Sequence, residues 1–541
     1  MDFRELVSKM LKLEILVLGL SLFLVYLVST AIYNLYFHPL AKLPGPFWAR
    51  VSTIPSWYHT KNQNRHLWLL KLQEHYGPEF RHRPDSACIN TPSAYRHIYG
   101  PRGNVKKSDQ YKVWPRTVDA LNTWNTTSVE IHAHKRRVLN YAFSEAALRS
   151  AEPFIHKNVD RWIELLGQRK GQGQDWTESI NMADQVTYLV FDILGDLCFG
   201  KCFDMKETGS NLTYVVEMMI GFLETMHVVG WAPWRDAWVY LKPRGLDQVL
   251  ALTLPATVKS WDAFVASCQE SRARTQYEIE GKLDAETRKD FFHWLWEAKD
   301  PESGRGYTLP ELNAECELLT IAGSDTTATV LSALLFYLSR NHNVQDRLAD
   351  EVLAKFSTYD EIKSGNKLQS CQYLTAFLHE GMRMAPPVGA DPSREVLEGG
   401  MTINERYYPA GSLVSTAFWS MQYNNDYYPA PLRFRPERWI VGEEGSTEES
   451  VAVAESAFCT FSTGPRGCVG KNMAWLEMRI VIAKLIWEFE VKRDPNSNLG
   501  GGSSNGEWGR RHEDQYQTWD IFVSNRKGPL VHLKKRVHEN S

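Results

Sequence analysis

One cysteine of this chain lies in a segment whose composition suits a metal ligand. Residues 461–470 read FSTGPRGCVG and place Cys468 among three glycines, a proline and Arg466. The next residues, KNMAWLEMRIVIAKLIWEFE, carry apolar side chains at helical spacing, so Cys468 is predicted to lie at or just before a helix N-terminus. Free backbone N–H groups and the positive end of the helix dipole stabilise a thiolate there. A thiolate is a soft, anionic ligand that suits the axial position of haem iron.

Two other chemistries need a different spacing. A phosphate-binding loop of the form GxxxxGK[ST] would need glycine where Pro465 stands, and here Lys471 is followed by Asn472. A phosphatase-type nucleophile would need arginine six residues after the cysteine, where Ala474 stands. A buried structural cysteine stays open as an interpretation, although it gives no reason for the glycines or for Arg466.

A second candidate site lies within a long apolar-periodic helix that is predicted to start near Leu309. Its segment IAGSDTTATVLSALLFYLSRN contains Gly323, followed by the short polar residues Ser324 to Thr327, which weaken a helix. Taken alone, this pattern favours a bend in a core helix. Beside a haem, a local bulge would make a groove for dioxygen, where the acid Asp325 and the alcohol Thr326 would relay protons.

Charged residues recur in three further segments. Glu380 and Arg383 are one helical turn apart in FLHEGMRMAPP, a spacing that on a solvated helix gives an ion pair worth about 0.2–0.5 kcal/mol. Arg438 follows in FRPERW. His132 and Arg136 lie on one face of the helix predicted for EIHAHKRRVLNYAFS.

Together these segments resemble the cytochrome P450 family, the haem-thiolate monooxygenases. FSTGPRGCVG matches the family's haem-ligand loop FxxGxRxCxG, and the IAGSDTT segment matches its (A/G)Gx(D/E)T(T/S) pattern. The resemblance implies that Cys468 is the axial haem ligand, that Phe461 packs near the sulfur, and that Arg466 pairs with a haem propionate. It also implies that Thr326 hydrogen-bonds the bound oxygen and that Asp325 delivers protons.

The resemblance assigns the remaining charged residues as well. It implies that Glu380, Arg383 and Arg438 form a structural triad that clamps a helix to the loop leading to the cysteine. It implies propionate contacts for His132 and Arg136, with Arg137 the weaker candidate, and for Arg394 in SREV. One departure from the family is Gln422-Tyr423, where His-Arg is common, so a propionate contact is not expected there.

The elements that position these residues belong to an ordinary globular chain. Of 541 residues 43% are hydrophobic and 23% charged, and the net charge of −3 gives no general attraction to nucleic acid. Eight cysteines are too few for a disulfide framework. Long helical stretches alternate with short strands, concentrated around residues 385–420 and near the C-terminus. We therefore predict a mainly α fold with small β-sheets (α+β), a single catalytic domain over residues 47–541.

The N-terminus differs from the rest of the chain. After a short segment of residues 1–12, residues 13–37 are nearly all apolar and would span about 37 Å as a helix, enough to cross a bilayer. A cleaved signal peptide usually has a shorter apolar stretch of about 7–15 residues. We predict a transmembrane anchor, followed by a stiff proline-rich hinge, HPLAKLPGP, over residues 38–46. The flanking charges do not settle the orientation.

The resemblance extends to function. It implies a monooxygenase that inserts one oxygen atom of O2 into a lipophilic small molecule, in fungal secondary-metabolite biosynthesis, at the endoplasmic reticulum membrane with its catalytic domain in the cytosol. Electrons would come from a separate NADPH-dependent flavoprotein reductase, docked on a basic face near Arg466 and Lys471 to which Lys135 and Arg137 contribute. A haem-thiolate isomerase or dehydratase, and a non-enzymatic membrane haem binder, remain as alternatives. The intact Asp325-Thr326 pair argues against both.

The substrate side of the pocket is predicted only as regions. The apolar segment of residues 218–234 is either a lid that dips into lipid or ordinary core. Residues 105–125, 388–391 and 516–519 are predicted to line the pocket.

Overall fold

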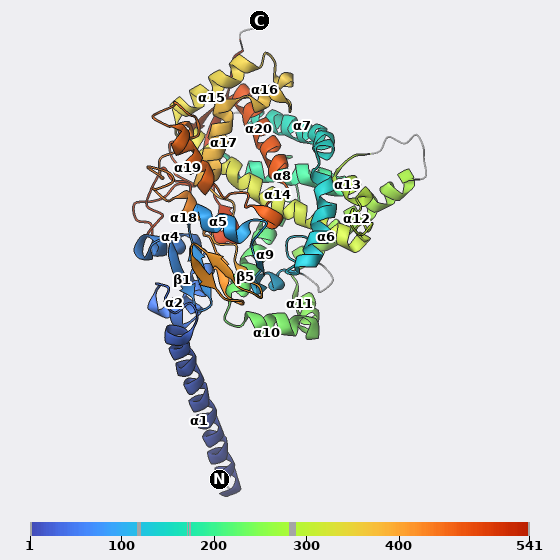
Figure 1. Ribbon diagram of the computed structural model, residues 1–541. Coiled ribbons are helices and arrows are strands. Elements are labelled where there is room, and N and C mark those ends of the chain that lie inside the picture. Colours follow the sequence, from blue (N-terminus) through green and yellow to red (C-terminus); the bar gives the residue numbers. More distant parts are fainter. Residues whose placement is uncertain (1–2, 116–120, 170, 172–174, 281–287, 539–541) are drawn as a thin grey trace.

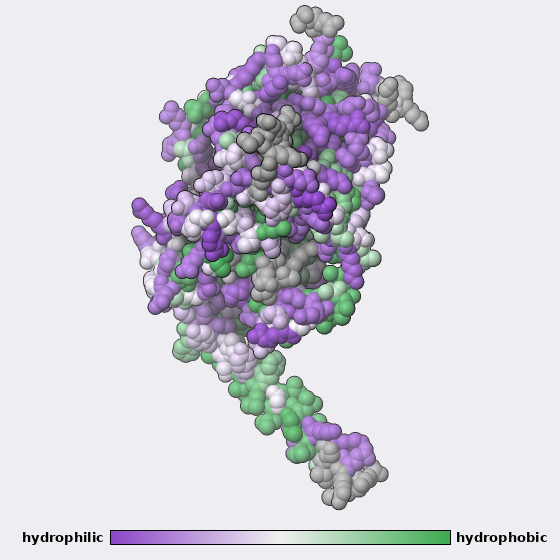
Figure 2. Space-filling view, turned by 90° about the vertical axis from the view of Figure 1, so that its right-hand side faces the viewer, coloured by the Kyte–Doolittle hydropathy of each residue, from purple (hydrophilic) through white to green (hydrophobic). Residues whose placement is uncertain are grey.

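In the computed structural model, the described residues are 3–115, 121–169, 171, 175–280 and 288–538. The N-terminal helix stands away from the body of the protein as a rod (Figure 1). It begins at Phe3, before the predicted residue 13, and ends in a π-helical turn, Tyr33–Phe37. Its apolar stretch Lys9–Phe37 is unburied and long enough to cross a membrane, which is compatible with an anchor. Figure 2 shows it as a green stalk below a mostly purple and white body.

Hydrogen bonds from side chains to backbone carbonyls hold the end of this rod against the body. Arg81 donates hydrogen bonds to the carbonyl of Asn34 at 2.7 Å and to that of Pro84 at 2.8 Å. Asn34 in turn donates to the carbonyl of Val51 at 3.1 Å. A Cβ on Gly45 would lie 2.1 Å from the Arg81 carbonyl oxygen, so only glycine fits in the hinge there.

Helices make up most of the body. In chain order the α-helices are α1 (Phe3–Ile32), α2 (Phe47–Val51), α3 (Ile54–Lys61), α4 (Arg65–Tyr76), α5 (Pro92–Tyr99), α6 (Val129–Leu139), α7 (Glu145–Gly167), α8 (Met182–Phe199), α9 (Tyr214–Trp231), α10 (Arg235–Leu241), α11 (Leu246–Thr253), α12 (Ala256–Glu280), α13 (Phe291–Glu297), α14 (Leu309–Leu338), α15 (His342–Lys355), α16 (Asn366–Gln369), α17 (Gln372–Met384), α18 (Phe418–Gln422), α19 (Glu448–Ala457) and α20 (Lys471–Glu488).

The strands form small sheets. They are β1 (Glu79–Arg83), β2 (Ser86–Ile89), β3 (Val105–Lys107), β4 (Ile180–Asn181), β5 (Arg394–Val396), β6 (Met401–Ile403), β7 (Arg406–Tyr408), β8 (Leu413–Ser415), β9 (Phe489–Arg493), β10 (Thr518–Ile521), β11 (Val523–Arg526) and β12 (Leu530–Lys535). One sheet has the order β1-β2-β8-β5-β3 and another β4-β12-β9, while β6-β7 and β10-β11 are separate pairs. The mainly α architecture with small β-sheets confirms the predicted fold class.

The strand prediction was incomplete at the N-terminal end. The sequence predicts strands around residues 385–420 and near the C-terminus, but β1, β2 and β3 supply three members of the five-stranded sheet. The sequence of β1, EFRHR, lacks the apolar alternation typical of a half-buried strand. Its polar side chains are nevertheless buried, because partners distant in the sequence, such as Asn34 for Arg81, satisfy them.

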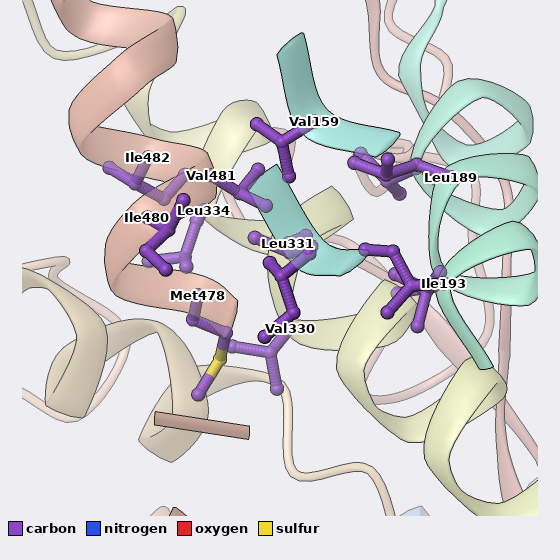
Figure 3. Close-up of a cluster of buried hydrophobic side chains, with 14 of the residues drawn as sticks. Val159, Leu189, Ile193, Val330, Leu331, Leu334, Met478, Ile480, Val481 and Ile482 are labelled. Carbon is purple, nitrogen blue, oxygen red and sulfur yellow. The ribbon is translucent and has the colours of Figure 1, made fainter. Parts of the chain in front are cut away.

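The core lies where α7, α8, α14 and α20 meet (Figure 3). By length and composition α14 could also span a membrane, but 72% of its apolar window is buried inside the body, so it is a core helix. Aliphatic side chains of these helices interdigitate there, among them Val159, Leu189, Ile193, Val330, Leu331, Leu334, Met478 and Ile480.

The bulge predicted near Gly323 does not interrupt the helix, because α14 is assigned as α-helix throughout Leu309–Leu338. A Cβ on Gly323 would lie 2.6 Å from Cδ1 of Leu194 on α8, so the glycine permits close helix packing. The polar residues are accommodated by bonds to the preceding turn: the Thr326 hydroxyl donates to the carbonyl of Ala322 at 2.7 Å, and Thr329 donates to that of Asp325 at 2.9 Å.

Candidate active site

Cys468 lies in a tight turn that ends just before α20. Its backbone N–H donates to the Phe461 carbonyl at 2.8 Å and so closes the loop. Gly464 has a φ of +67°, and a Cβ there would lie 2.2 Å from the Tyr99 carbonyl oxygen, so this position needs glycine. The Cys468 side chain is exposed, whereas the other seven cysteines are buried or half-buried. The turn therefore presents one thiol to a partner.

The groups around Cys468 act on its pKa in both directions. Burial raises the pKa of the thiol, although its side chain is accessible, and the Gly470 backbone N–H with the charges of Arg136 and Lys471 lowers it. Burial has the larger effect. The helix N-terminus predicted from the sequence does stabilise the thiolate, but not enough to bring the pKa of the thiol below its ordinary value. A bound metal ion deprotonates a coordinating thiol. A thiolate at Cys468 is thus favoured when a cation binds the sulfur.

Cations converge on the sheet edge near the cysteine loop. Lys107 on β3 stands directly opposite Arg394 on β5, and each is only 4% exposed. Like charges in such opposed positions destabilise a sheet. Burial and the neighbouring Arg394 lower the pKa of Arg466 to about 9. Burial, Arg466, Lys107 and Arg136 lower the pKa of His132 to about 3. Such a cluster calls for an anion.

No carboxylate in the described part of the chain forms an ion pair with Lys107, Arg394 or Arg466. The guanidinium of Arg466 donates instead to the backbone carbonyls of Thr126 at 2.9 Å and Thr123 at 3.3 Å. Arg394 donates to the backbone carbonyls of Ser393 at 3.1 Å and Pro392 at 3.2 Å. Carbonyl groups do not neutralise the guanidinium charges. We call Lys107, Arg136, Arg394 and Arg466, together with the neutral imidazole of His132, the cation cradle. It is buried or half-buried and carries a net positive charge.

Two members of the predicted set have different contacts from those expected. Arg136 donates to the carbonyl of Gly467 at 2.6 Å and therefore braces the cysteine loop itself. Arg137 is turned away and pairs with Asp300 at 2.6 Å, which agrees with its lower rank in the sequence analysis. Lys107 was missed, because its segment carries no motif and only its strand pairing with Arg394 reveals it.

On α14, Asp325 is buried and forms an ion pair with Arg526 of β11 at 2.8 Å. Arg526 also donates to the hydroxyls of Thr329 at 2.8 Å and Thr187 at 2.7 Å. The second carboxylate oxygen of Asp325, Oδ2, accepts no hydrogen bond from a described residue. Sequence reasoning missed Arg526, since 201 residues separate it from Asp325. The neighbouring Thr326 is half-buried, and Ala322, one turn earlier, is exposed although it lies in a core helix.

The structure brings Glu380, Arg383 and Arg438 together. Glu380 on α17 accepts hydrogen bonds from Arg383 at 2.8 and 2.9 Å and from Arg438 at 3.0 Å. It also accepts from the Arg435 backbone at 3.0 Å and the Trp439 indole at 2.9 Å. Burial raises the pKa of Glu380, but the two arginines outweigh it and hold that pKa at about 2. This carboxylate therefore stays ionised inside the protein.

Gln422, at the departure from the family pattern, connects the same helix to the cysteine loop. Its side-chain amide nitrogen donates to the Arg383 backbone carbonyl at 3.1 Å, and its side-chain oxygen, Oε1, accepts from the Thr460 hydroxyl at 2.9 Å. The Arg383 guanidinium in turn donates to the backbone carbonyl of Gln422 at 2.9 Å. The residue is wholly buried and has a structural role.

Comparison with known proteins identifies the family. Residues 43–500 match the family model described as Cytochrome P450. The chain belongs to the cytochrome P450 family. It is 33% identical to "Cytochrome P450 monooxygenase AKT7" of Alternaria alternata over 95% of this chain and 96% of that protein. It is also 33% identical to "Cytochrome P450 monooxygenase fscF" of Fusarium equiseti and to "Cytochrome P450 monooxygenase apf7" of Gibberella fujikuroi, covering 95% of this chain and 96% and 97% of those proteins.

This P450 is a haem-thiolate monooxygenase that takes electrons from a redox partner, as its family does. The site fits that cofactor. Haem carries two propionates, and the cation cradle supplies buried positive charge without carboxylate partners. The accessible Cys468 thiol supplies the kind of soft ligand that haem iron takes. A buried charge cluster without a counter-ion is costly unless an anion joins it.

Glu315 on α14 is connected to the cradle residue Arg466 through Thr123. It is wholly buried and accepts hydrogen bonds from the Thr123 backbone at 2.7 Å and the Thr123 hydroxyl at 2.8 Å. The carbonyl of Thr123 in turn accepts from Arg466. Burial raises the pKa of Glu315 from 4.5 to about 7, although Lys135 opposes the shift.

The raised pKa predicts a pH-dependent stability. Between pH 4.5 and pH 7 the folded state holds the Glu315 proton more tightly than the unfolded state does, so this group stabilises the protein at low pH and loses that contribution as the pH rises. The Glu315→Gln variant stays neutral, and we expect its melting temperature relative to wild type to rise across this window. Thermal unfolding of the holoenzyme measured at several pH values checks this. Glu455→Gln, at an exposed position on α19, is the control; an equal response in both variants would contradict the prediction.

Proposed function

We propose that haem binds with Cys468 as its axial ligand and its propionates in the cation cradle. The observation that carries this proposal is the buried pair Lys107 and Arg394, two cations opposite each other in neighbouring strands and without a carboxylate partner among the described residues. Arg466 belongs to the same cradle, while Arg136 holds the carbonyl of Gly467 in the cysteine loop. The bound haem supplies the activation of dioxygen.

We further propose that Asp325 and Thr326 manage the protons of the reaction. Thr326 is half-buried beside the exposed Ala322, so its hydroxyl can turn from the Ala322 carbonyl toward a bound oxygen. The unpartnered oxygen of Asp325 can accept and release a proton, while Arg526 holds the other oxygen. Arg526 is thus a positioning residue for Asp325.

A reconstituted system tests these roles together with the reductase. We mix the purified enzyme with an NADPH-dependent flavoprotein reductase and use 2-methoxynaphthalene as a lipophilic probe. Removal of a positioned proton donor typically slows a reaction about 10²–10⁴-fold. For Asp325→Asn we expect at least about a 10²-fold loss of product formation, and for Thr326→Ala we expect NADPH to be spent on hydrogen peroxide.

Thr320→Ala is the matched control, because Thr320 is on the same helix and its hydroxyl makes the same bond one turn back, to Cys316 at 2.9 Å. The haem absorption spectrum should stay unchanged in all three variants. Equal peroxide yields for Thr326→Ala and Thr320→Ala would remove Thr326 from proton delivery. Full activity without reductase would favour the isomerase or dehydratase alternative.

For location we propose a single-pass protein of the endoplasmic reticulum membrane with its catalytic domain, residues 47–541, in the cytosol. Among the described residues two single helices are long and apolar enough to span a membrane, and of these two Lys9–Phe37 is unburied while Leu309–Leu338 is largely buried. Exposed apolar side chains also gather in α10 and α11, on the side of the body from which α1 projects (Figure 1). Among them are Tyr240, Leu241 and Leu252. Residues 218–231 lie in α9, several of whose side chains are buried, so α10 and α11 are the better candidates for lipid contact.

The reductase surface we proposed from the sequence needs a correction. Lys135 is 2% exposed and its ammonium lies 3.1 Å from Glu311, so it cannot meet a partner protein. Arg137 is engaged by Asp300 and Glu302. Lys471 is exposed at the start of α20 and remains in the proposed docking face.

The substrate is proposed to be a lipophilic product of fungal secondary metabolism, since the similar proteins come from fungi and are named monooxygenases. Of the regions predicted to line the pocket, residues 116–120 lie outside the described residues.

A further inference from the structure

A buried acid–base pair lies between α9 and the β10–β11 hairpin, outside the cradle and the cysteine loop. His227 is 4% exposed, and its Nε2 lies 3.3 Å from Oδ1 of Asp520, which is 2% exposed. The Phe522 backbone N–H donates to the same Oδ1 at 3.1 Å, and the Asp520 backbone N–H donates to the Gln63 carbonyl at 2.8 Å. These contacts fix the position of the carboxylate.

The other oxygen of Asp520, Oδ2, is buried and accepts no hydrogen bond from a described residue. Burial raises the pKa of Asp520, but His227, His66 and Arg65 outweigh it and hold that pKa at about 2. The carboxylate is therefore ionised at neutral pH. Arg65 is already paired with Asp391, and neither ring nitrogen of His66 forms a hydrogen bond. A buried ionised oxygen without a donor is costly, and a donor that arrives with a ligand would stabilise it.

An aromatic cluster adjoins this pair. Phe522 has a φ of +85°, a conformation that bulky residues rarely adopt and that is found at functional sites. Its ring centroid lies 6.0 Å from that of His227, 5.2 Å from that of Trp114 and 4.9 Å from that of Trp124. Trp124 and Phe522 are half-buried, so part of each ring is accessible.

The same cluster reaches the cation cradle. The Lys107 ammonium lies 4.7 Å from the ring centroid of Trp124 and donates to its carbonyl at 2.5 Å. A continuous series of contacts thus runs from Lys107 through Trp124 and Phe522 to His227 and Asp520. The cradle marks the proposed haem edge, so the acid lies at the far end of an aromatic wall that starts there.

We propose that Asp520 is a specificity-determining residue, whose free oxygen accepts a hydrogen bond from a hydroxyl group of the substrate while the substrate's ring system packs against Phe522 and Trp124. This inference rests on the proposed haem site. It assigns the substrate class as an aromatic or polycyclic lipophile that already carries a hydroxyl group. An oxidation or a cyclisation that leaves a hydroxyl group must then precede this enzyme.

Three probes of similar shape test the wild-type protein. Equilibrium dialysis of the holoenzyme measures the binding of 2-naphthol, which has a hydroxyl donor, of 2-methoxynaphthalene, which has only an acceptor, and of naphthalene, which has neither. A hydrogen bond to a buried charged group is worth about tenfold or more in affinity. We therefore expect 2-naphthol to bind about tenfold or more tightly than 2-methoxynaphthalene. Equal affinities would overturn the proposal without any variant.

The Asp520→Asn variant gives the sharper result. Its carbonyl oxygen can still accept the Phe522 N–H, so its amide group, a donor, takes the place of the free oxygen. We expect the preference to reverse in favour of 2-methoxynaphthalene. Asp426→Asn, the same change at an exposed position, should keep the wild-type preference. An unchanged preference in Asp520→Asn would overturn the proposal.

The two proposals fail in different ways. The carbon monoxide difference spectrum of each reduced sample reports the haem-thiolate site, while dialysis reports the hydroxyl preference. A normal spectrum with no preference would overturn the role of Asp520 alone. An absent thiolate spectrum in the wild type would overturn the proposed haem site.

Discussion

We expect the Cys468→Ser variant to lose the red-shifted carbon monoxide band of a haem-thiolate protein and all monooxygenase turnover. Cys468 presents its thiol in a turn closed by the Phe461 carbonyl, and serine fits the same backbone. A serine hydroxyl is neutral at pH 7 and is a hard ligand, so it cannot supply the soft anionic sulfur that haem iron receives from cysteine. The spectrum of the reduced protein with carbon monoxide measures this directly.

Cys459→Ser is the matched control, nine residues earlier in the chain. Cys459 is buried, and its thiol lies 3.8 Å from the Phe418 carbonyl, away from the turn that holds Cys468. Burial raises the pKa of the Cys459 thiol well above its ordinary range, so it is inert. This control should keep the thiolate band. Retention of the band in Cys468→Ser would remove Cys468 as the haem ligand and leave the cation cradle without an iron site beside it.

Local motifs predicted the turn, the long core helix and the charge triad well. Cys468 is followed by a helix, and Glu380 meets Arg383 one turn away, because these relations are set by backbone geometry over a few residues. The same local reasoning predicted a bulge at Gly323, where α14 continues without a break. Glycine is needed at position 323 because Leu194 of α8 packs closely against it. This contact depends on tertiary packing and not on the neighbouring residues in the sequence.

Functional residues that belong to no local motif could not be predicted from the sequence. Lys107 becomes a cradle residue only when β3 pairs with β5, and Arg526 becomes a partner of Asp325 only when the C-terminal hairpin folds back on α14. Long-range pairing of this kind leaves no periodic pattern in one sequence. The same holds for His227 and Asp520. The turn that holds the proposed haem ligand Cys468 was therefore predictable from the sequence, whereas the charged and aromatic residues around it were not.

We expect the Glu380→Leu variant to fail to accumulate as a haem-containing protein. The carboxylate is wholly buried and offsets the guanidinium charges of Arg383 and Arg438, which are themselves 0% and 3% exposed. Removing one partner of a buried ion pair leaves an unpaired charge and costs about 3–5 kcal/mol. That is a large fraction of the roughly 5–15 kcal/mol that holds a folded domain together. Haem content per mole of purified protein and the urea midpoint of unfolding measure the effect.

The exposed pair Arg161 and Glu164 has the same spacing and a distance of 2.8 Å, so Glu164→Leu is the matched control. Water screens this pair, and its loss should change stability by less than about 1 kcal/mol. We expect Glu380→Gln to lower stability less than Glu380→Leu does, because its amide keeps a carbonyl oxygen that can accept from one of the donors. Equal midpoints for Glu380→Leu and Glu164→Leu would mean that Glu380 does not clamp α17 to the segment carrying Arg438. A loss confined to the buried pair would instead show that burial, and not the three-residue spacing seen in the sequence, makes this triad structural.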